Sequence, residues 1–321
     1  MNNELTYWFT LANIPKWGNA KVNKFVLNFF HDKKITIEEF FNLSEAVLQN
    51  EYSFSNQELL DFQNAKSALA SNAFIVENLL SQGFEIIPIT SSEYSPILKK
   101  NLKLSHAPSV LYIKGNRQIL KESAIAIVGS RAAENISLEF TDNIAQKASK
   151  EFKVIVSGFA KGVDKQALDS ALKYKGQSII VLPQGIATFD SGFRKYYKQI
   201  VDGDVLVLST YHPNTIWSAG HAMARNPVIY GLANEIYVAE SAEKGGTWEG
   251  VSDGLKKGRT IYVRMPEVSE KNANKLLIAK GATPVDFEGN LIENNFNESS
   301  ISNMPNTKES KIENLQVELF L

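Results

Sequence analysis

The stretch SAIAIVGSRAAENISLEFTDNIAQKASKEFKVIVSGFAKGVD, residues 123–164, decides the fold. Its first segment, residues 123–128, is a continuous apolar run, as expected for a strand that is buried on both faces. A helical pattern follows over residues 134–150, and residues 153–156 form a second apolar strand. Two consecutive units of strand, small-residue turn and helix predict a parallel, doubly wound sheet.

A small-residue turn follows each of these two strands. The first is Gly-Ser-Arg at residues 129–131, and the second is Ser-Gly at residues 157–158 with Gly162 close behind. Such turns open at the carboxyl ends of adjacent strands, where doubly wound sheets bind ligands. Small residues let a phosphate approach the backbone, and the N-termini of the following helices attract its charge. Arg131 and Lys161 add positive charge, so the sequence predicts an anion-binding crevice here.

The rest of the chain continues the alternation of strands and helices after a helical first part. Apolar residues recur at helical spacing up to about residue 82. From residue 83 on we expect a Rossmann-like, doubly wound, mainly parallel α/β sheet of about seven or more strands, with an N-terminal helical module before it. The further strands are expected at 84–89, 109–116, 178–185, 204–211, 235–241 and 260–266, and the further helices at 164–175, 194–202, 218–231, 247–257 and 269–280.

Three parts are therefore expected. They are a helical module over 1–82, a Rossmann-like domain over 83–287 and a tail over 288–321. The tail begins with a stretch that is rich in Asn, Ser and Glu and has little to bury, which predicts a flexible linker.

Composition excludes several classes of protein. The formal net charge is −1, so the chain does not coat nucleic acid by bulk charge, and any anion site must be local. The absence of cysteine excludes disulfides, thiolate zinc sites and cysteine nucleophiles. The four histidines show no paired ligand spacing, and we expect no metal. The N-terminus does not read as a signal peptide and no apolar run has membrane-spanning length, so we expect a cytoplasmic protein with no membrane partner.

One turn in the helical module suggests contact with DNA. Residues 14–21, IPKWGNAK, are similar to a helix-hairpin-helix turn, which grips DNA phosphates through backbone amides. The usual pair of glycines is replaced by Trp17-Gly18. The alternative is a small packing module.

Several motifs in order resemble the DprA/Smf family of DNA-processing proteins. They are YSPIL at 94–98, LYIKGN at 111–116, AIVGSR at 126–131, SGFAKGVD at 157–164 and the Arg-Asn pair at 225–226. The resemblance covers roughly residues 83–266. The chain departs from the family pattern in three ways. Residues 183–189 keep only one clear glycine, Gly185, of a glycine-rich segment. The family's Phe-Pro-x-Arg-Asn is replaced by HAMARN at residues 221–226, and the winged-helix domain that many members carry is not seen. These departures indicate a divergent member.

The resemblance implies a function in DNA processing or recombination. It implies a protein that binds single-stranded DNA without strong sequence preference and hands it to the strand-exchange recombinase, as in natural transformation. It further implies a homodimer, no cofactor and no catalytic residue. The residues expected to contact nucleic acid or phosphate are Gly129, Ser130, Arg131, Ser157, Gly158, Lys161, Gly162, Arg225, Asn226, Gly246 and Thr247.

An enzyme is the main alternative. Residues 245–249, GGTWE, resemble the phosphate-binding motif of the LOG-type nucleoside-monophosphate phosphoribohydrolases, with Thr247 and Glu249 in the matching places and one glycine missing. A nucleotide-sensing pocket at the same place is a third alternative. Trp217 and Trp248 are equally compatible with core positions and with platforms on which bases stack.

The end of the chain carries a separate motif. Residues 316–320, QVELF, resemble the peptide that docks bacterial replication proteins onto the sliding clamp. In that interpretation Leu319 and Phe320 fill an apolar pocket and Gln316 makes polar contacts. The alternative is a terminal strand or helix that folds back on the domain.

Overall fold

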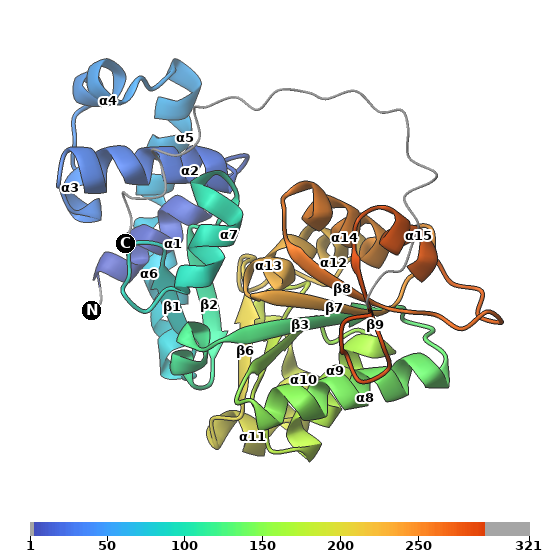
Figure 1. Cartoon of the computed structure of the whole chain (residues 1–321). Helices are drawn as coiled ribbons and strands as arrows, with labels where there is room; N and C mark the ends of the chain where they lie inside the picture. The colour runs from blue at the N-terminus through green and yellow to red at the C-terminus, as the bar shows by residue number, and fades with distance from the viewer. Residues whose placement is uncertain (1–2, 293–321) are drawn as a thin grey trace, which may run out of the picture.

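A computed structural model of the chain describes residues 3–292 and shows one mixed sheet of nine strands in the order β1-β2-β6-β5-β4-β3-β7-β8-β9 (Figure 1). From β6 to β9 all neighbouring strands are parallel, whereas β1 and β2 are antiparallel to their neighbours. The predicted α/β class with a mainly parallel, doubly wound sheet is confirmed. The strands are β1 Glu85–Pro88, β2 Val110–Lys114, β3 Ala124–Gly129, β4 Val154–Ser157, β5 Ser178–Val181, β6 Val205–Ser209, β7 Glu235–Glu240, β8 Thr260–Arg264 and β9 Thr283–Val285.

The helices follow the predicted alternation. Their bounds are α1 Asn3–Ala12, α2 Asn19–Val26, α3 Ile37–Phe41, α4 Glu45–Tyr52, α5 Asn56–Ser67, α6 Leu69–Ser81, α7 Pro96–His106, α8 Asn135–Lys150, α9 Val163–Lys173, α10 Asp190–Lys195, α11 Tyr197–Val201, α12 Ala219–Ala224, α13 Asn226–Gly231, α14 Gly246–Lys256 and α15 Asn274–Ala279. A π-helical segment, Leu27–Asp32, continues α2.

Three predicted helices differ from the structure. The helix predicted at 218–231 is two helices, because Pro227 lies in the first turn of α13 and lacks the N–H that would continue α12. The helix predicted at 194–202 is likewise split, into α10 and α11 at Tyr196. The one predicted at 269–280 begins only at Asn274. Strand β9 was not among the strands expected from the sequence.

The order of the strands reverses beside β3. The chain passes from β3 through β4 and β5 to β6 in one direction, and β7, β8 and β9 then extend the sheet on the other side of β3. The loops that leave β3 and β7 therefore diverge at the carboxyl ends of two adjacent strands. This is the position at which open α/β sheets form a binding crevice.

Alternate residues of the central strands supply two separate cores. On β3, Ile125 and Ile127 face α8 and α9, whereas Ala126 and Val128 face the opposite side with α13 and α14. The period of two explains why the sequence of β3 is apolar throughout, since both of its faces are covered.

The N-terminal helices have an aromatic core. The ring of Phe40 stacks on Phe29 at 4.6 Å between centroids and meets Tyr52 and Phe62 edge-on. Trp17, from the turn that is similar to a helix-hairpin-helix, is buried in the same cluster and donates a hydrogen bond to Asp61 Oδ2 at 3.1 Å. The turn thus has a packing function, and contact with DNA there stays a prediction.

The N-terminal helices pack against the sheet. Asn13, just after α1, donates from Nδ2 to the Tyr112 hydroxyl of β2 at 2.8 Å, and the buried cluster runs without a break from α1 into the sheet. The predicted boundary at residue 82 falls in the connection between α6 and β1, and a domain boundary there stays a prediction.

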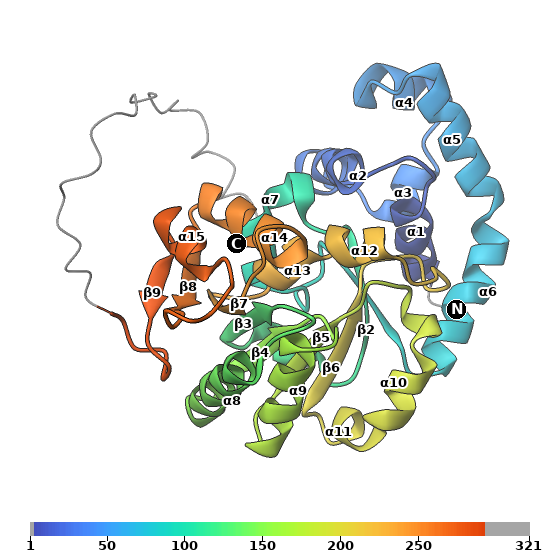
Figure 2. The ribbon, with the colours of Figure 1, turned by 90° about the vertical axis from the view of Figure 1, so that its right-hand side faces the viewer.

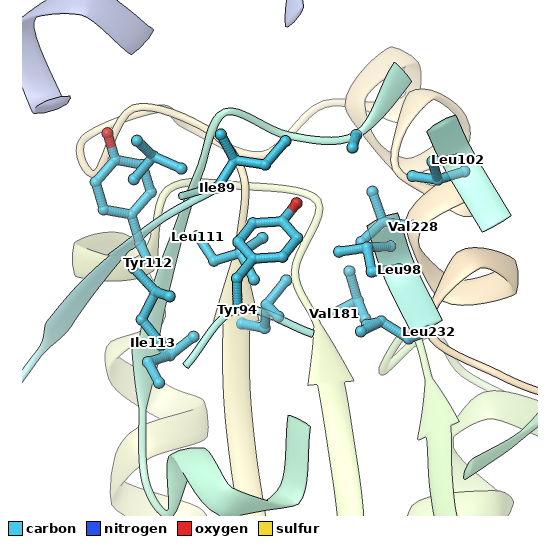
Figure 3. Packing of buried hydrophobic residues seen from close by; sticks show 14 of the residues in the cluster. Ile89, Tyr94, Leu98, Leu102, Leu111, Tyr112, Ile113, Val181, Val228 and Leu232 are labelled. Carbon is cyan, nitrogen blue, oxygen red and sulfur yellow. The ribbon is translucent and has the colours of Figure 1, made fainter. Parts of the chain in front are cut away.

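Helix α7 joins the antiparallel edge of the sheet to α13. Figure 3 shows Leu98 beside Val228 and Leu232 of the α13 region. A Cβ on Gly231 would lie 2.7 Å from Leu98 Cδ1, so the two helices meet where one of them has no side chain. This contact fixes α13, and with it one wall of the site described below.

Within residues 3–292, no helix combines the length and the apolar character that crossing a bilayer requires.

We predict that Asn23→Ala destabilises the junction of α2 with the chain after α7. The buried Asn23 amide donates to Leu104 O at 2.6 Å and Ala107 O at 2.8 Å and accepts from Ser109 Oγ at 2.9 Å. Removing it leaves these groups unpaired, which costs about 3 kcal/mol of the free energy of unfolding in urea titration. Asn50→Ala, at an exposed position of α4, is the matched control and should change that free energy by less than about 0.5 kcal/mol. Equal stabilities for the two variants would contradict the assignment.

Candidate nucleic-acid interface

A cavity of about 350 Å³ lies at the carboxyl ends of β3, β4 and β7, where the strand order reverses. Both loops that diverge there contribute to it, the one after β3 and the one after β7. Further lining residues come from helices α12 and α13, which Figure 2 shows next to each other. Its lining residues are Val128, Gly129, Ser130, Arg131, Ala160, Asp164, Ala219, Ala222, Met223, Arg225, Asn226, Ile229, Tyr230, Ala242, Lys244, Gly246 and Thr247.

The two glycine turns predicted from the sequence, after β3 and after β4, are in direct backbone contact. Gly162 has φ +78°, and a Cβ there would lie 2.3 Å from Ser130 O. The Val163 amide donates to the same carbonyl at 3.3 Å. A Cβ on Gly129 would lie 2.5 Å from Val163 Cγ2. The glycines thus serve first to bring the β3 and β4 turns into backbone contact, which forms one wall of the cavity.

Two of the three nearby helix N-termini already hold a carboxylate of the chain itself. Glu240 Oε2 accepts from Glu134 N at 3.0 Å and Ser137 Oγ at 2.8 Å, at the start of α8. Asp164 lies in the first turn of α9, and its Oδ2 accepts from Ala160 N, in the turn before the helix, at 3.4 Å. The sequence predicts that the partial positive charges at the starts of α8 and α9 attract a phosphate. In the structure, a carboxylate of the chain lies at each of these two helix N-termini.

The N-terminus of α14 differs, because among residues 3–292 no carboxylate accepts a hydrogen bond from the backbone at the start of this helix. Its N-cap is Gly245, with φ +97°, and the first-turn residues Gly246 and Thr247 line the cavity. The acidic residue of that turn, Glu249, is exposed and does not line the cavity. An eleven-residue helix thus presents free amides and the positive end of its dipole to the cavity.

Arg225 forms the floor and is only 4% exposed. Its guanidinium donates to Gly158 O at 2.7 Å and to Asn226 Oδ1 at 3.2 Å, and it lies 4.0 Å from Asp164 Oδ2. Its Nε is buried and has no hydrogen-bond partner within residues 3–292. The site thus contains a buried donor that is left unsatisfied, which is costly without a ligand.

Burial shifts both charged groups of the floor toward their neutral forms. It lowers the pKa of Arg225, which the charge of Asp164 partly opposes. It raises the pKa of Asp164, and the charge of Arg225 opposes this shift. In each case the effect of burial exceeds the opposing effect of the neighbouring charge.

Two exposed cations complete the charge of the site. Arg131 and Lys244 line the cavity with Arg225, so three cationic side chains face one carboxylate, that of Asp164. Sequence reasoning missed Lys244, although it directly precedes the glycine pair of the α14 turn.

The structure brings together seven of the eleven predicted residues. Gly129, Ser130, Arg131, Arg225, Asn226, Gly246 and Thr247 line the cavity. Ser157, Gly158, Lys161 and Gly162 do not: Ser157 is buried and donates to Ile127 O at 3.4 Å, Gly158 lies against Arg225, and Lys161 is exposed outside the cavity. The clamp-peptide residues Gln316, Leu319 and Phe320 lie outside the described residues.

The remaining wall is apolar. Ala219, Ala222 and Met223 of α12 and Ile229 of α13 add apolar side chains to the lining. The site can therefore hold a ligand with a phosphate at one end and an apolar or aromatic part at the other. Among residues 3–292, no three His, Asp or Glu side chains are grouped to bind a metal.

Comparison with known proteins relates the chain to DNA-processing proteins. The sequence model described as DNA recombination-mediator protein A matches residues 85–295. The DNA processing protein DprA of Streptococcus pneumoniae is 35% identical over 156 residues, which are 49% of this chain and 55% of that protein. That of Bacillus subtilis is 30% identical over 185 residues, 56% of this chain and 60% of that protein. The matches thus span between half and two thirds of these two relatives.

One further relative matches over most of the chain, and two solved structures match in fold. Protein Smf of Synechocystis is 25% identical over 299 residues, covering 91% of this chain and 72% of that protein. The crystal structure of the Streptococcus pneumoniae protein matches with a TM-score of 0.68 at 24% identity, covering 89% of this chain and 95% of that one. A structure of DNA processing protein A from Helicobacter pylori, solved to explain how that protein binds single-stranded DNA, matches with a TM-score of 0.53 at 24% identity, covering 63% of this chain and 90% of that one. These two structures show a shared fold.

We predict that Gly158→Ala damages the floor of the cavity. The new Cβ would lie 2.0 Å from both terminal nitrogens of the Arg225 guanidinium, which is buried and hydrogen-bonded. Relieving the clash should cost about 1–3 kcal/mol of the free energy of unfolding, measured in urea. The control is Gly220→Ala in α12, where the nearest atom, Ser218 Oγ, is 3.8 Å away. A Gly158→Ala protein as stable as the control variant would show that Arg225 is not fixed in this position.

Proposed function

We propose, from the premise that the chain belongs to the DNA recombination-mediator protein A family of DNA-processing proteins, that it binds single-stranded DNA through the cavity at the carboxyl ends of β3 and β7. In this proposal a backbone phosphate of the strand binds at the N-terminus of α14. Arg131 and Lys244 pair with phosphates at the rim, and Arg225 supplies its unpartnered Nε from the floor.

The observation that carries the proposal is that the first turn of α14 lines the same cavity as three cationic side chains. A helix N-terminus with free amides binds phosphate, and charge–phosphate contacts make affinity independent of sequence. The overall charge of −1 leaves little attraction elsewhere, so binding should depend on this local set of groups.

The wider function in the proposal rests on the family resemblance. It comprises protection of single-stranded DNA, its transfer to the strand-exchange recombinase during recombination or natural transformation, and assembly as a cytoplasmic homodimer. The motif at 316–320 adds a proposed contact with the sliding clamp, in which Leu319 and Phe320 dock and the preceding tail gives reach. Deletion of residues 316–321 should abolish that contact and leave binding of DNA unchanged.

The proposal is for a binding protein and not for an enzyme. A phosphoribohydrolase of the LOG type would need Glu249 at the substrate, but this side chain is exposed and outside the cavity lining. Asp164 is the carboxylate among the lining residues; it is buried, accepts from Ala160 N and lies 4.0 Å from the Arg225 guanidinium, so we assign it a structural function in the floor and not the function of an acid or base at a glycosidic bond.

The test is fluorescence-anisotropy titration of a labelled oligo-dT at several salt concentrations, with Arg131→Ala and Lys244→Ala. Each variant removes one charge–phosphate contact, so affinity should fall on the order of tenfold at low salt, and the slope of log K against log salt should flatten by about 0.7. Lys150→Ala, in the last turn of α8 at the end of that helix remote from the cavity, is the matched control and should leave both quantities unchanged.

Lys161→Ala measures how far the strand extends past the cavity toward the β4 turn, and we expect a smaller effect than for Lys244→Ala. Absence of binding by the wild type at low salt would overturn the proposal. Equal losses for Lys150→Ala and Lys244→Ala would overturn the assignment of the cavity as the site.

A further inference from the structure

Two large apolar side chains are displayed to solvent beside the cavity. Ile216 is 77% exposed and Trp217 is 52% exposed. Met223, one turn into α12, is 43% exposed and also lines the cavity. Single exposed apolar residues are ordinary, but an adjacent pair that includes a tryptophan, at the edge of a charged pocket, indicates a contact surface.

The segment that carries these side chains is firmly held. Ser218 Oγ accepts from His221 N at 3.0 Å, and His221 Nδ1 donates to Ile216 O at 3.2 Å. The His221 ring lies 4.7 Å from the Tyr211 ring, whose hydroxyl donates to His221 O at 2.9 Å. The segment that carries Ile216 and Trp217 is therefore held in place and does not turn these side chains inward. Because the segment is already ordered, little conformational entropy is lost there when a ligand binds.

The pair lies close to the cavity in the chain and in space. Trp217 precedes Ala219, the first wall residue of α12, by two positions, so their Cα atoms are at most about 7.6 Å apart. Figure 2 shows α12 lying over the carboxyl end of the sheet beside α13 and α14. A neighbouring base of a strand whose phosphate enters the cavity can therefore reach Trp217.

We infer that Ile216 and Trp217 form a platform on which a nucleobase of the bound single strand stacks. The inference rests on the proposed binding of single-stranded DNA and adds the groups that recognise bases to those that hold phosphates. Stacking on an aromatic side chain is tolerant of sequence, because every base has an apolar face. A cationic pocket with an aromatic side chain at its edge matches the two chemically different halves of a nucleotide.

The size of the patch favours a nucleobase over a protein partner. A stable protein interface buries about 800 Å² on each partner, which two or three side chains do not supply. The cations of the neighbouring cavity also favour a polyanion. Trp248 is not the platform: it is half-buried against the core, and Lys280 Nζ lies over its ring at 5.4 Å.

The experiment compares two labelled oligomers of equal length, one of dT and one with an abasic deoxyribose-phosphate backbone. The wild-type protein should bind the dT oligomer more tightly. Trp217→Ala should weaken binding of the dT oligomer about tenfold and leave binding of the abasic oligomer and its salt dependence unchanged. Trp217→Phe should retain most of the affinity for dT, because it keeps an aromatic face.

The matched control is Phe152→Ala. This side chain is 90% exposed and lies just before β4, at the amino end of that strand, whereas the cavity lies at the carboxyl ends. It should affect neither oligomer. Circular dichroism shows whether each variant is folded. If Trp217→Ala is unfolded, the test relies on the Trp217→Phe variant.

Three outcomes would overturn the inference while leaving the proposed function standing. They are unchanged dT binding by Trp217→Ala, an equal loss on both oligomers, and a change in oligomeric state of Trp217→Ala by size-exclusion chromatography, which would indicate a protein interface. A wild type that binds neither oligomer at low salt would overturn the proposed function, and the platform with it.

Discussion

The buried guanidinium of Arg225 is the interaction on which the rest of the site depends. It lies at the break between α12 and α13, donates to the backbone of the β4 turn at Gly158 and faces Asp164 of α9. It thereby joins segments from both sides of the point where the strand order reverses. A buried ion pair of this kind contributes little net stability, but leaving one partner alone costs about 3–5 kcal/mol. The geometry of the cavity is therefore fixed by the need to keep two opposite charges together.

That constraint explains how anion binding is distributed over the helices. The interlocked turns leave no room between them, and the starts of α8 and α9 are met by Glu240 and Asp164. These carboxylates satisfy amides that would otherwise be unpaired in a partly buried place. At α14, the first-turn residues Gly246 and Thr247 line the cavity together with Arg131, Arg225 and Lys244. The pocket therefore has the rigid β3 and β4 turns in one wall and the N-terminus of α14 in another, so a bound phosphate is expected at the α14 end.

The N-terminal helices contribute to the site through the loop before α12. The ring of Phe9 in α1 lies 5.5 Å from the ring of His212, and the Gly185 amide donates to Thr215 O at 2.8 Å in the same loop. Packing therefore continues from the aromatic core of the helices to the segment that displays Trp217. Rigidity at that segment matters, because an exposed aromatic side chain is useful for binding only if it is held away from the protein core.

The sequence by itself determined the local structure and its order. The apolar runs of β3 and β4, the glycine turns after them and the alternation of strands and helices predicted a doubly wound sheet with an anion site at its carboxyl edge, because these signals depend on neighbours in the chain. Pro227 could also have shown the break before α13. Only the tertiary structure decided which groups face the cavity. Glu240 accepts from the backbone at the start of α8, and Arg225 is buried against Gly158. Each of these contacts joins residues that are distant in the chain, so no local pattern encodes it. The exposure of Trp217 likewise depends on how the whole chain packs.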